Sequence, residues 1–163
     1  MININKIVKQ LELFSEGIIE FNKKATEGDL LAFENKMKVS LPNDYRTFLQ
    51  IYNGLSLMGV IIYGVGDSKP LSLEKVFDVE HNEVGNPMPS YLIPFSPDGM
   101  GNHYCFNMQS CTAESCQVLF WQHDYWYTET DLPEVTHSSF ADWVQEVVLE
   151  WTLKDYDYDG KKK

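Results

Sequence analysis

The spacing of apolar residues changes twice along this chain, and this change limits the folds open to it more than any other feature. Apolar residues first recur three and four positions apart, which predicts amphipathic helices. Short apolar runs separated by turn-forming residues follow, and helical spacing then returns near the C-terminus. Helices, then a run of strands, then a helix predict an α+β fold in which helices pack on a mainly antiparallel sheet of short strands.

The helix boundaries carry local start and stop signals. Thr26 and Asp29 predict the start of a second helix, and Leu41-Pro42 ends it and opens a third. Asn53-Gly54 is expected to end the third helix, and Ser138 or Ser139 to cap the last one. The apolar faces of the four helices are Ile4, Ile7, Val8, Leu11 and Phe14; Leu30, Leu31, Phe33 and Met37; Tyr45, Phe48, Leu49 and Tyr52; and Phe140, Trp143, Val144, Val147, Val148 and Trp151.

Four apolar runs between these helices predict strands. Residues 57–65 are expected to form one buried strand, and residues 71–79 are ambiguous between a strand and a short helix. The turn signal Ser96-Pro97-Asp98-Gly99 separates two of the later runs. The three later predicted strands cover residues 91–95, 103–107 and 117–121.

The length and composition suit one domain with its own core. At 163 residues with 44% hydrophobic content, the chain can bury a core without a metal or disulfide framework. We expect a single domain over residues 1–154 and a polar, flexible tail over 155–163. The three cysteines, the charged N-terminal helix and the absence of a long apolar run predict a cytoplasmic protein that does not enter the membrane.

The charge is strongly one-sided. The formal net charge is −11, and no Lys or Arg occurs between Lys75 and Lys154, a stretch that contains twelve acidic residues. Such a field repels phosphate backbones and anionic membranes and attracts basic proteins. The sequence therefore predicts no nucleic-acid and no membrane partner, although acidic surfaces also serve solubility.

No motif for catalysis or for a cofactor is complete. Gly64-Val65-Gly66 lacks the third glycine of a dinucleotide fingerprint, and Asp155 to Gly160 lacks the closing glutamate of a calcium loop. Cys105, Cys111 and Cys116 do not have zinc-knuckle spacing, whereas Cys111 and Cys116 can form a local disulfide. The four histidines have no evident nucleophile beside them. We therefore expect no enzyme activity, no catalytic residue, no metal and no cofactor.

Residues 121–131 are the most suggestive partner-binding segment. Trp and Tyr are enriched at interface hot spots, and here they alternate with acids. Trp121 is expected in the core, and the predicted contact residues in this segment are Asp124, Trp126, Tyr127, Glu129 and Asp131. Four further acids are expected to add negative potential if they share that side: Asp78, Glu80, Glu83 and Glu134.

Four local motifs resemble those of the SUKH superfamily, which contains the yeast cell-wall-assembly regulator and many bacterial immunity proteins. They are Leu41-Pro42-Asn43-Asp44-Tyr45 with Phe48-Leu49 and Asn53-Gly54; Ile93-Pro94-Phe95 with Asp98 to Asn102 and Tyr104 to Asn107; Val118 to Trp121 with His123-Asp124; and Ser139 to Trp143. The predicted first strand departs from the pattern, with more glycine and less charge. The resemblance implies four helices with an antiparallel sheet, and a role in neutralising a toxin.

Three functions follow as expectations. The first is stoichiometric inhibition of a toxin domain with a basic surface, nuclease-like or deaminase-like, by a monomer or homodimer. The second is a non-enzymatic regulatory scaffold in cell-wall or stress signalling. The third is a small-molecule-binding domain with a pocket lined by His103, Tyr104 and Trp121.

Overall fold

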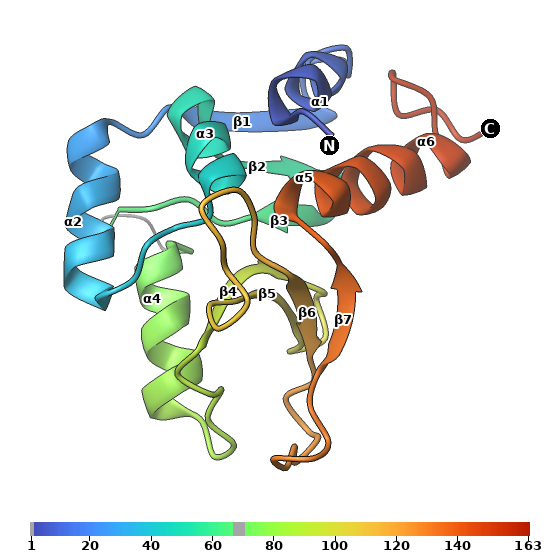
Figure 1. The fold of residues 1–163 in the computed structure, drawn as a ribbon. Coiled ribbons are helices and arrows are strands. Elements are labelled where there is room, and N and C mark those ends of the chain that lie inside the picture. Colours follow the sequence, from blue (N-terminus) through green and yellow to red (C-terminus); the bar gives the residue numbers. More distant parts are fainter. Residues whose placement is uncertain (1, 67–70) are drawn as a thin grey trace.

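The computed structural model describes residues 2–66 and 71–163, and shows the predicted α+β architecture (Figure 1). Met1 and residues 67–70 belong to the predicted domain but lie outside the described residues. In chain order the elements are α1 (Ile4–Leu11), β1 (Ile19–Lys23), α2 (Glu27–Met37), α3 (Asn43–Ile51), β2 (Tyr52–Leu57), β3 (Val60–Ile62), α4 (Leu73–Asp78), η1 (Val79–Glu83), β4 (Leu92–Pro97), β5 (His103–Asn107), β6 (Val118–Trp121), β7 (Glu134–His137), α5 (Phe140–Trp143), η2 (Val144–Glu150) and α6 (Trp151–Asp155).

The described strands form two antiparallel sheets, in the orders β1-β2-β3 and β4-β5-β6-β7. The sheets meet where β3 runs beside β4. There the backbone N–H of Tyr63 donates to the carbonyl of Phe95 at 2.9 Å, and the Ser96 hydroxyl donates to the carbonyl of Ile61 at 2.6 Å. These two bonds join the edges of the two sheets.

Strands β4 to β6 of the four-stranded sheet carry buried side chains on both faces. One face meets α3 and the C-terminal helical segment (residues 140–155) through tilted and edge-to-face aromatic rings, with centroids 5.0 Å apart for Tyr45 and Phe106 and 4.9 Å apart for Phe95 and Trp143. The other face carries a smaller cluster of apolar side chains: Met88, Leu92, Cys105, Leu119 and Trp121. Because side chains alternate along a strand, neighbouring residues of β5 and β6 serve opposite faces.

The Leu41 to Tyr45 motif ties α3 to distant parts of the chain. The Asp44 carboxylate accepts the backbone N–H of Ala141 at 2.9 Å, in the first turn of α5. The Tyr45 hydroxyl donates to the carbonyl of Tyr63 at 2.6 Å. Burial raises the pKa of Asp44, even though the backbone N–H groups of Ala141 and Tyr45, which donate to it, favour its charged form. The motif therefore positions the C-terminal helical segment as well as starting α3.

The strand predicted for residues 57–65 is wrong, because a tight turn divides it. Met58 and Gly59 both have positive φ angles, 47° and 93°, which produce the turn between β2 and β3. Residues 52–57 belong to the preceding strand instead. A non-glycine residue in this backbone region is uncommon, so the Met58 position gave no turn signal in the sequence.

Asn53-Gly54 does not cap α3 as expected. The helix ends at Ile51, and both residues lie inside β2. The Asn53 amide exchanges two hydrogen bonds of 2.8 Å with the backbone of Val65. Gly54 has a φ of 95°, and a Cβ there would approach the carbonyl oxygen of Ile62 to 2.6 Å. The pair holds two chain segments close together.

The C-terminal helical segment, residues 140–155, is capped by Ser139, one of the two serines predicted for this role. The Ser139 side chain accepts the backbone N–H of Asp142, and most of the expected apolar face is buried. Trp151 is the exception, because half of its surface is exposed. The ambiguous residues 71–79 include helix α4.

Residues 155–163 were expected to be flexible, but in the structure they form a turn that packs on the N-terminal part of the chain. Tyr156 pairs with Lys162, and the carbonyl of Tyr158 accepts the backbone N–H of Ser15 at 2.8 Å. The Tyr158 ring lies 4.8 Å from that of Phe14. The apolar side of Tyr158 therefore joins the core, which the acidic composition of this segment does not suggest.

Candidate functional site

The loop between β6 and β7 has a defined shape that hydrogen bonds maintain. We call residues 122–132 the Trp126 loop. The side-chain amide of Asn86 donates to the carbonyls of His123 at 3.0 Å and Tyr125 at 2.9 Å. Farther along, the backbones of Thr128 and Asp131 bond to each other in both directions. The loop is thus anchored to the segment after η1 and closed on itself.

Tyr127 fixes the loop to the smaller apolar cluster. Its ring lies 4.8 Å from that of Trp121, which is 2% exposed and is a core residue as expected. Its hydroxyl accepts the backbone N–H of Gln122 at 3.2 Å. The hydroxyl of the neighbouring Tyr125 donates to the Asp131 carboxylate. Tyr127 is therefore a support for the loop more than a free contact residue.

Trp126 projects from this support into solvent. Its side chain is 70% exposed, and Leu132 in the same loop is 61% exposed. Val135 of β7 is also exposed, and it pairs with Leu119, so it lies on the same sheet face as the loop. The exposed acids Asp124, Glu129 and Asp131 flank these apolar groups. The loop and β7 thus expose apolar side chains and acids on this side of the sheet, with Trp126 the most exposed of these apolar groups.

The other predicted acids do not all join this surface. Glu80 of η1 is half-buried, and burial raises its pKa, an effect that the nearby His123 of the loop and His81 partly offset. Glu83 is exposed at the end of η1. Asp78 lies in a hollow with Lys36 and Lys75, on the α2 side of α4.

Glu134 lies on the opposite sheet face from the loop. It pairs with Phe120, which pairs with Tyr104, so its side chain is directed toward the C-terminal helical segment. Glu134 is only six residues from Thr128 in the sequence. Side chains alternate between the two faces of the sheet along β7, however, so Glu134 is on the other side from Trp126.

The structure does not form the predicted pocket lined by His103, Tyr104 and Trp121. His103 and Trp121 pair across β5 and β6 and are 5% and 2% exposed, whereas Tyr104 points to the other face. Burial lowers the pKa of His103 to about 4, so the ring is neutral. Its Nε2 lies 3.2 Å from the Tyr63 hydroxyl, and its buried Nδ1 has no partner among the described residues.

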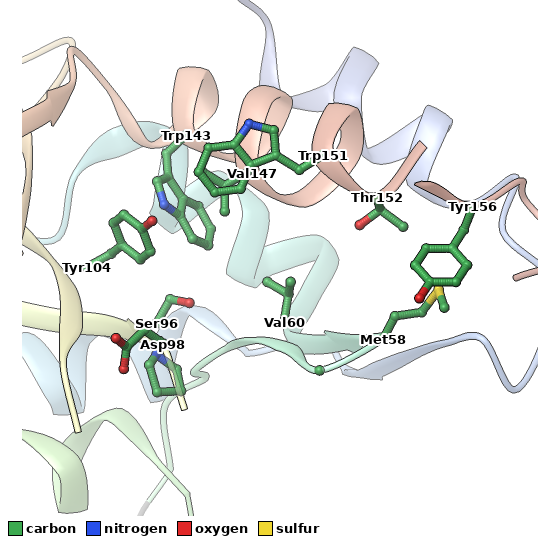
Figure 2. A pocket seen from close by; sticks show the side chains of 12 residues that line it. Met58, Val60, Ser96, Asp98, Tyr104, Trp143, Val147, Trp151, Thr152 and Tyr156 are labelled. Atoms are coloured by element: carbon green, nitrogen blue, oxygen red, sulfur yellow. The ribbon is translucent and has the colours of Figure 1, made fainter. Parts of the chain in front are cut away.

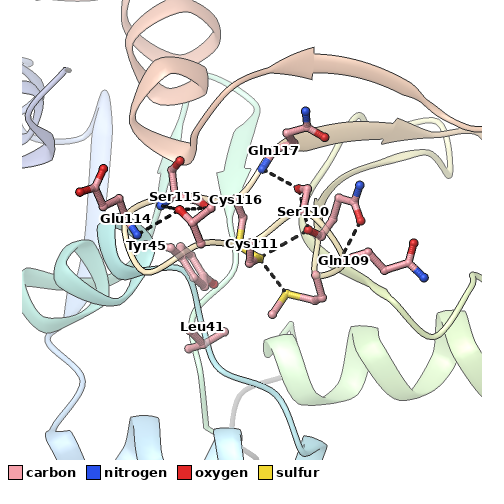
Figure 3. Close-up of a disulfide and its surroundings, with 12 residues drawn as sticks. Leu41, Tyr45, Gln109, Ser110, Cys111, Glu114, Ser115, Cys116 and Gln117 are labelled. Atoms are coloured by element: carbon pink, nitrogen blue, oxygen red, sulfur yellow. Dashed lines mark hydrogen bonds between the residues drawn. A yellow bond between two sulfur atoms is a disulfide. The ribbon is translucent and has the colours of Figure 1, made fainter.

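The cysteines form a local disulfide rather than a metal site. Cys111 and Cys116 are bonded, and Figure 3 shows them beside Leu41 and Tyr45. Cys105 is free and buried, and burial raises the pKa of its thiol. Within residues 2–66 and 71–163, no group of three or more His, Cys, Asp or Glu is placed to hold a metal ion. In the same ranges, no helix has the length and apolar character needed to cross a membrane.

Two comparisons with known proteins give matches. The family model SUKH_5, described as SMI1-KNR4 cell-wall, matches residues 4–150. A crystal structure of a protein from Pseudomonas syringae pv. tomato is 19% identical and has a TM-score of 0.66. That match covers 88% of this chain and 96% of the other, and it shows a shared fold. No curated protein matches the chain.

Proposed function

The chain belongs to the SMI1-KNR4 cell-wall family, and from this premise we propose that it is a non-enzymatic binding protein that neutralises a toxin domain by stoichiometric contact. The toxin domain has a basic surface of the kind that nucleases and nucleobase deaminases use to hold phosphates. The observation that carries the proposal is the exposed Trp126 on a loop whose shape is already set.

A tryptophan held in solvent by a rigid loop suits an interface anchor. Trp is among the residues that contribute most to protein–protein affinity when a partner buries them. Association is costly when loops must become ordered. Asn86 and Tyr127 already restrict this loop, so less of that cost remains to be met on binding.

The surrounding charge favours a basic partner. The loop lies within the stretch from residue 76 to 153, which contains no Lys or Arg. Asp124, Glu129 and Asp131 therefore have no basic neighbour in sequence to neutralise them. Charge complementarity of this kind raises association rates and rejects partners of like charge.

A regulatory scaffold is the second candidate, and the printed description of the family, SMI1-KNR4 cell-wall, is the observation that favours it. In that role the same surface binds an endogenous basic protein. The two candidates differ in the partner: a toxin encoded beside this gene supports the first, and an isolated gene supports the second.

The test is co-expression with the toxin domain encoded by the neighbouring gene, followed by co-purification and a growth-rescue assay. We expect a one-to-one complex that rescues growth. Trp126→Ala should weaken the complex by about 2 kcal/mol or more, roughly 30-fold. The control Leu13→Ala removes an apolar side chain of similar exposure, 61%, from the N-terminal part of the chain and should leave binding unchanged.

A charge-swap pair tests the electrostatic part. Asp124→Lys with Glu129→Lys should slow association and flatten its salt dependence. Glu16→Lys with Glu20→Lys makes the same change in net charge at exposed positions beside and within β1 and serves as the control. Equal effects of the two pairs would mean that only net charge matters. No complex and no rescue, with an active toxin, would favour the scaffold.

A further inference from the structure

A groove runs between the C-terminal helical segment and the two sheets. It has a volume of about 320 Å³, at the lower end of the range for ligand pockets. Trp143 and Trp151 of the helical segment form one wall, and Met58 and Val60 of the β2–β3 hairpin face them (Figure 2). We call it the C-terminal groove. It is separate from the Trp126 loop, which lies over the other face of the four-stranded sheet.

One end of the groove is acidic. Asp98 lines it, and the described lining residues include no Lys, Arg or His. Partial burial raises the pKa of Asp98, but hydrogen bonds outweigh this and lower the pKa below its usual value. The donors are the backbone N–H of Met100 at 2.7 Å, and the backbone and side-chain amides of Asn102 at 3.0 and 2.7 Å. Asp98 is therefore ionised at neutral pH.

Two more carboxylates, those of Glu134 and Glu146, affect Tyr104 without lining the groove, and Glu146 also pairs with His137 at 3.2 Å. Ser96, Tyr104, Phe120 and Glu134 pair across β4 to β7, so they form one row on the groove side of the sheet. Burial raises the pKa of Tyr104, and the charges of Asp98, Glu146 and Glu134 add to that rise. Three acids from different elements thus act on one phenol. At the opposite end lies Tyr156, which pairs with Lys162 (Figure 2).

Trp143, in the wall of the groove, has an indole N–H group without a hydrogen-bond partner among the described residues. The residue is fully buried. The centroid of the Tyr104 ring lies 5.2 Å from that of the Trp143 ring. A buried donor without an acceptor is unfavourable, and most such groups in proteins are satisfied. Because this N–H is enclosed by protein atoms, it reports on the packing of the groove wall and is not a contact for an occupant.

We propose that the C-terminal groove receives an arginine side chain and an adjoining apolar residue of the partner protein. The guanidinium lies beside Asp98 and Tyr104, because a planar cation stacks on aromatic rings and pairs with carboxylates. The aliphatic stem and the apolar neighbour contact Val60, Val147 and Trp151. This occupant rests on the proposed protein-binding function, but the groove can be tested without the partner.

The test is an NMR titration of the full chain with the dipeptide acetyl-Arg-Leu-amide. The chain has four tryptophans, whose indole N–H signals report separate places. We expect the signals of Trp143 and Trp151 to shift and those of Trp121 and Trp126 to stay. The same dipeptide with neutral citrulline in place of arginine should bind about tenfold more weakly, because it has no charge for Asp98. Equal binding of both dipeptides, or no shift at Trp143 and Trp151, would overturn the proposal.

Two variants in the C-terminal groove show whether the dipeptide binds there. Asp98→Asn should remove the preference for arginine over citrulline, and Trp151→Ala, at a half-exposed position, should weaken both dipeptides. Trp126→Ala should change neither and is the control. If a toxin complex forms but tolerates Asp98→Asn and Trp151→Ala, the groove proposal fails while the binding function stands. If no complex forms, the function fails, and the titration alone decides whether the groove binds arginine.

Discussion

The Trp126 loop and the C-terminal groove present tryptophan in opposite ways. The loop is one stretch of consecutive residues that projects a 70% exposed ring into solvent. The groove is assembled from the β2–β3 hairpin, β4, β5 and the C-terminal helical segment, and its Trp143 is fully buried. The Trp126 loop projects from the folded core, whereas the C-terminal groove is a part of the core that remains partly open to solvent.

Because of this difference, a substitution of Trp126 is expected to affect binding alone, whereas a substitution of Trp143 is expected to affect stability as well. Trp126 makes no ring contact that the structure records, so its removal takes little from the folded state. Trp143 contacts Phe95, Tyr104 and Phe140, so any change there alters both the groove and the core. A partner that used both surfaces would combine a contact that tolerates substitution with one that does not.

The largest expected effect contrasts these two tryptophans. Trp143→Ala should lower the free energy of unfolding by about 3–5 kcal/mol, because it leaves a cavity among packed rings. Trp126→Ala should change it by less than about 0.5 kcal/mol. Urea denaturation followed by circular dichroism measures both. Similar losses in the two variants would show that the Trp126 loop is part of the core and would break the comparison.

The next effect is a pH dependence of folding stability that comes from His103, in the sheet under the Trp126 loop. His103 pairs with Trp121, on which Tyr127 packs, and burial lowers its pKa from 6.5 to about 4. The unfolded chain therefore binds more protons between these values, and stability falls as the pH drops through this interval. Its contribution is present in full above pH 6.5 and amounts to about 3 kcal/mol.

His103→Gln isolates that contribution. The raised pKa values of Asp44 and Glu80 change stability in the opposite direction, so the comparison between wild type and variant is what matters. Urea denaturation at about pH 7 and about pH 4 should show a loss roughly 3 kcal/mol greater in the wild type. Parallel losses in the two proteins would exclude His103 as the cause.

The smallest effect concerns the shape of the loop. Asn86→Ala removes two hydrogen bonds to loop carbonyls, worth about 1 kcal/mol each. Amide hydrogen exchange should become faster in residues 122–132 and stay the same in residues 140–155. Asn82→Ala, which removes a hydrogen bond from η1 to Asp78 at the end of α4, is the control. Unchanged exchange in the loop would show that Tyr127 alone holds it.

Local patterns in the sequence predicted the elements whose causes are local. The helical spacing located α1, α2, α3 and the C-terminal helical segment, and the turn at Asp98 separated β4 from β5. The same reasoning missed β1 and β7, whose residues alternate weakly, and it joined β2 to β3 because Met58 is not a turn residue by type. Pairing with distant strands decides those elements.

The candidate surfaces divide in the same way. Trp126, Glu129 and Asp131 are neighbours in sequence, and the structure keeps them together on one loop. Asp78 and Glu134 were grouped with them only by charge, and the register of β7 and the position of α4 put them elsewhere. The groove gave no signal in the sequence, because its walls come from segments as far apart as Met58 and Tyr156.

By itself the sequence determined the α+β class, the helix starts, the acidic character of residues 76–153 and the aromatic segment at 121–127, since each depends on residue type and short-range spacing. Tertiary structure decided which face each strand residue serves, the pairing of Asn53 with Val65, and the placing of Asp98 and Tyr104 in one groove. The physical reason is that register and packing depend on contacts between distant segments, and these appear only when the core closes.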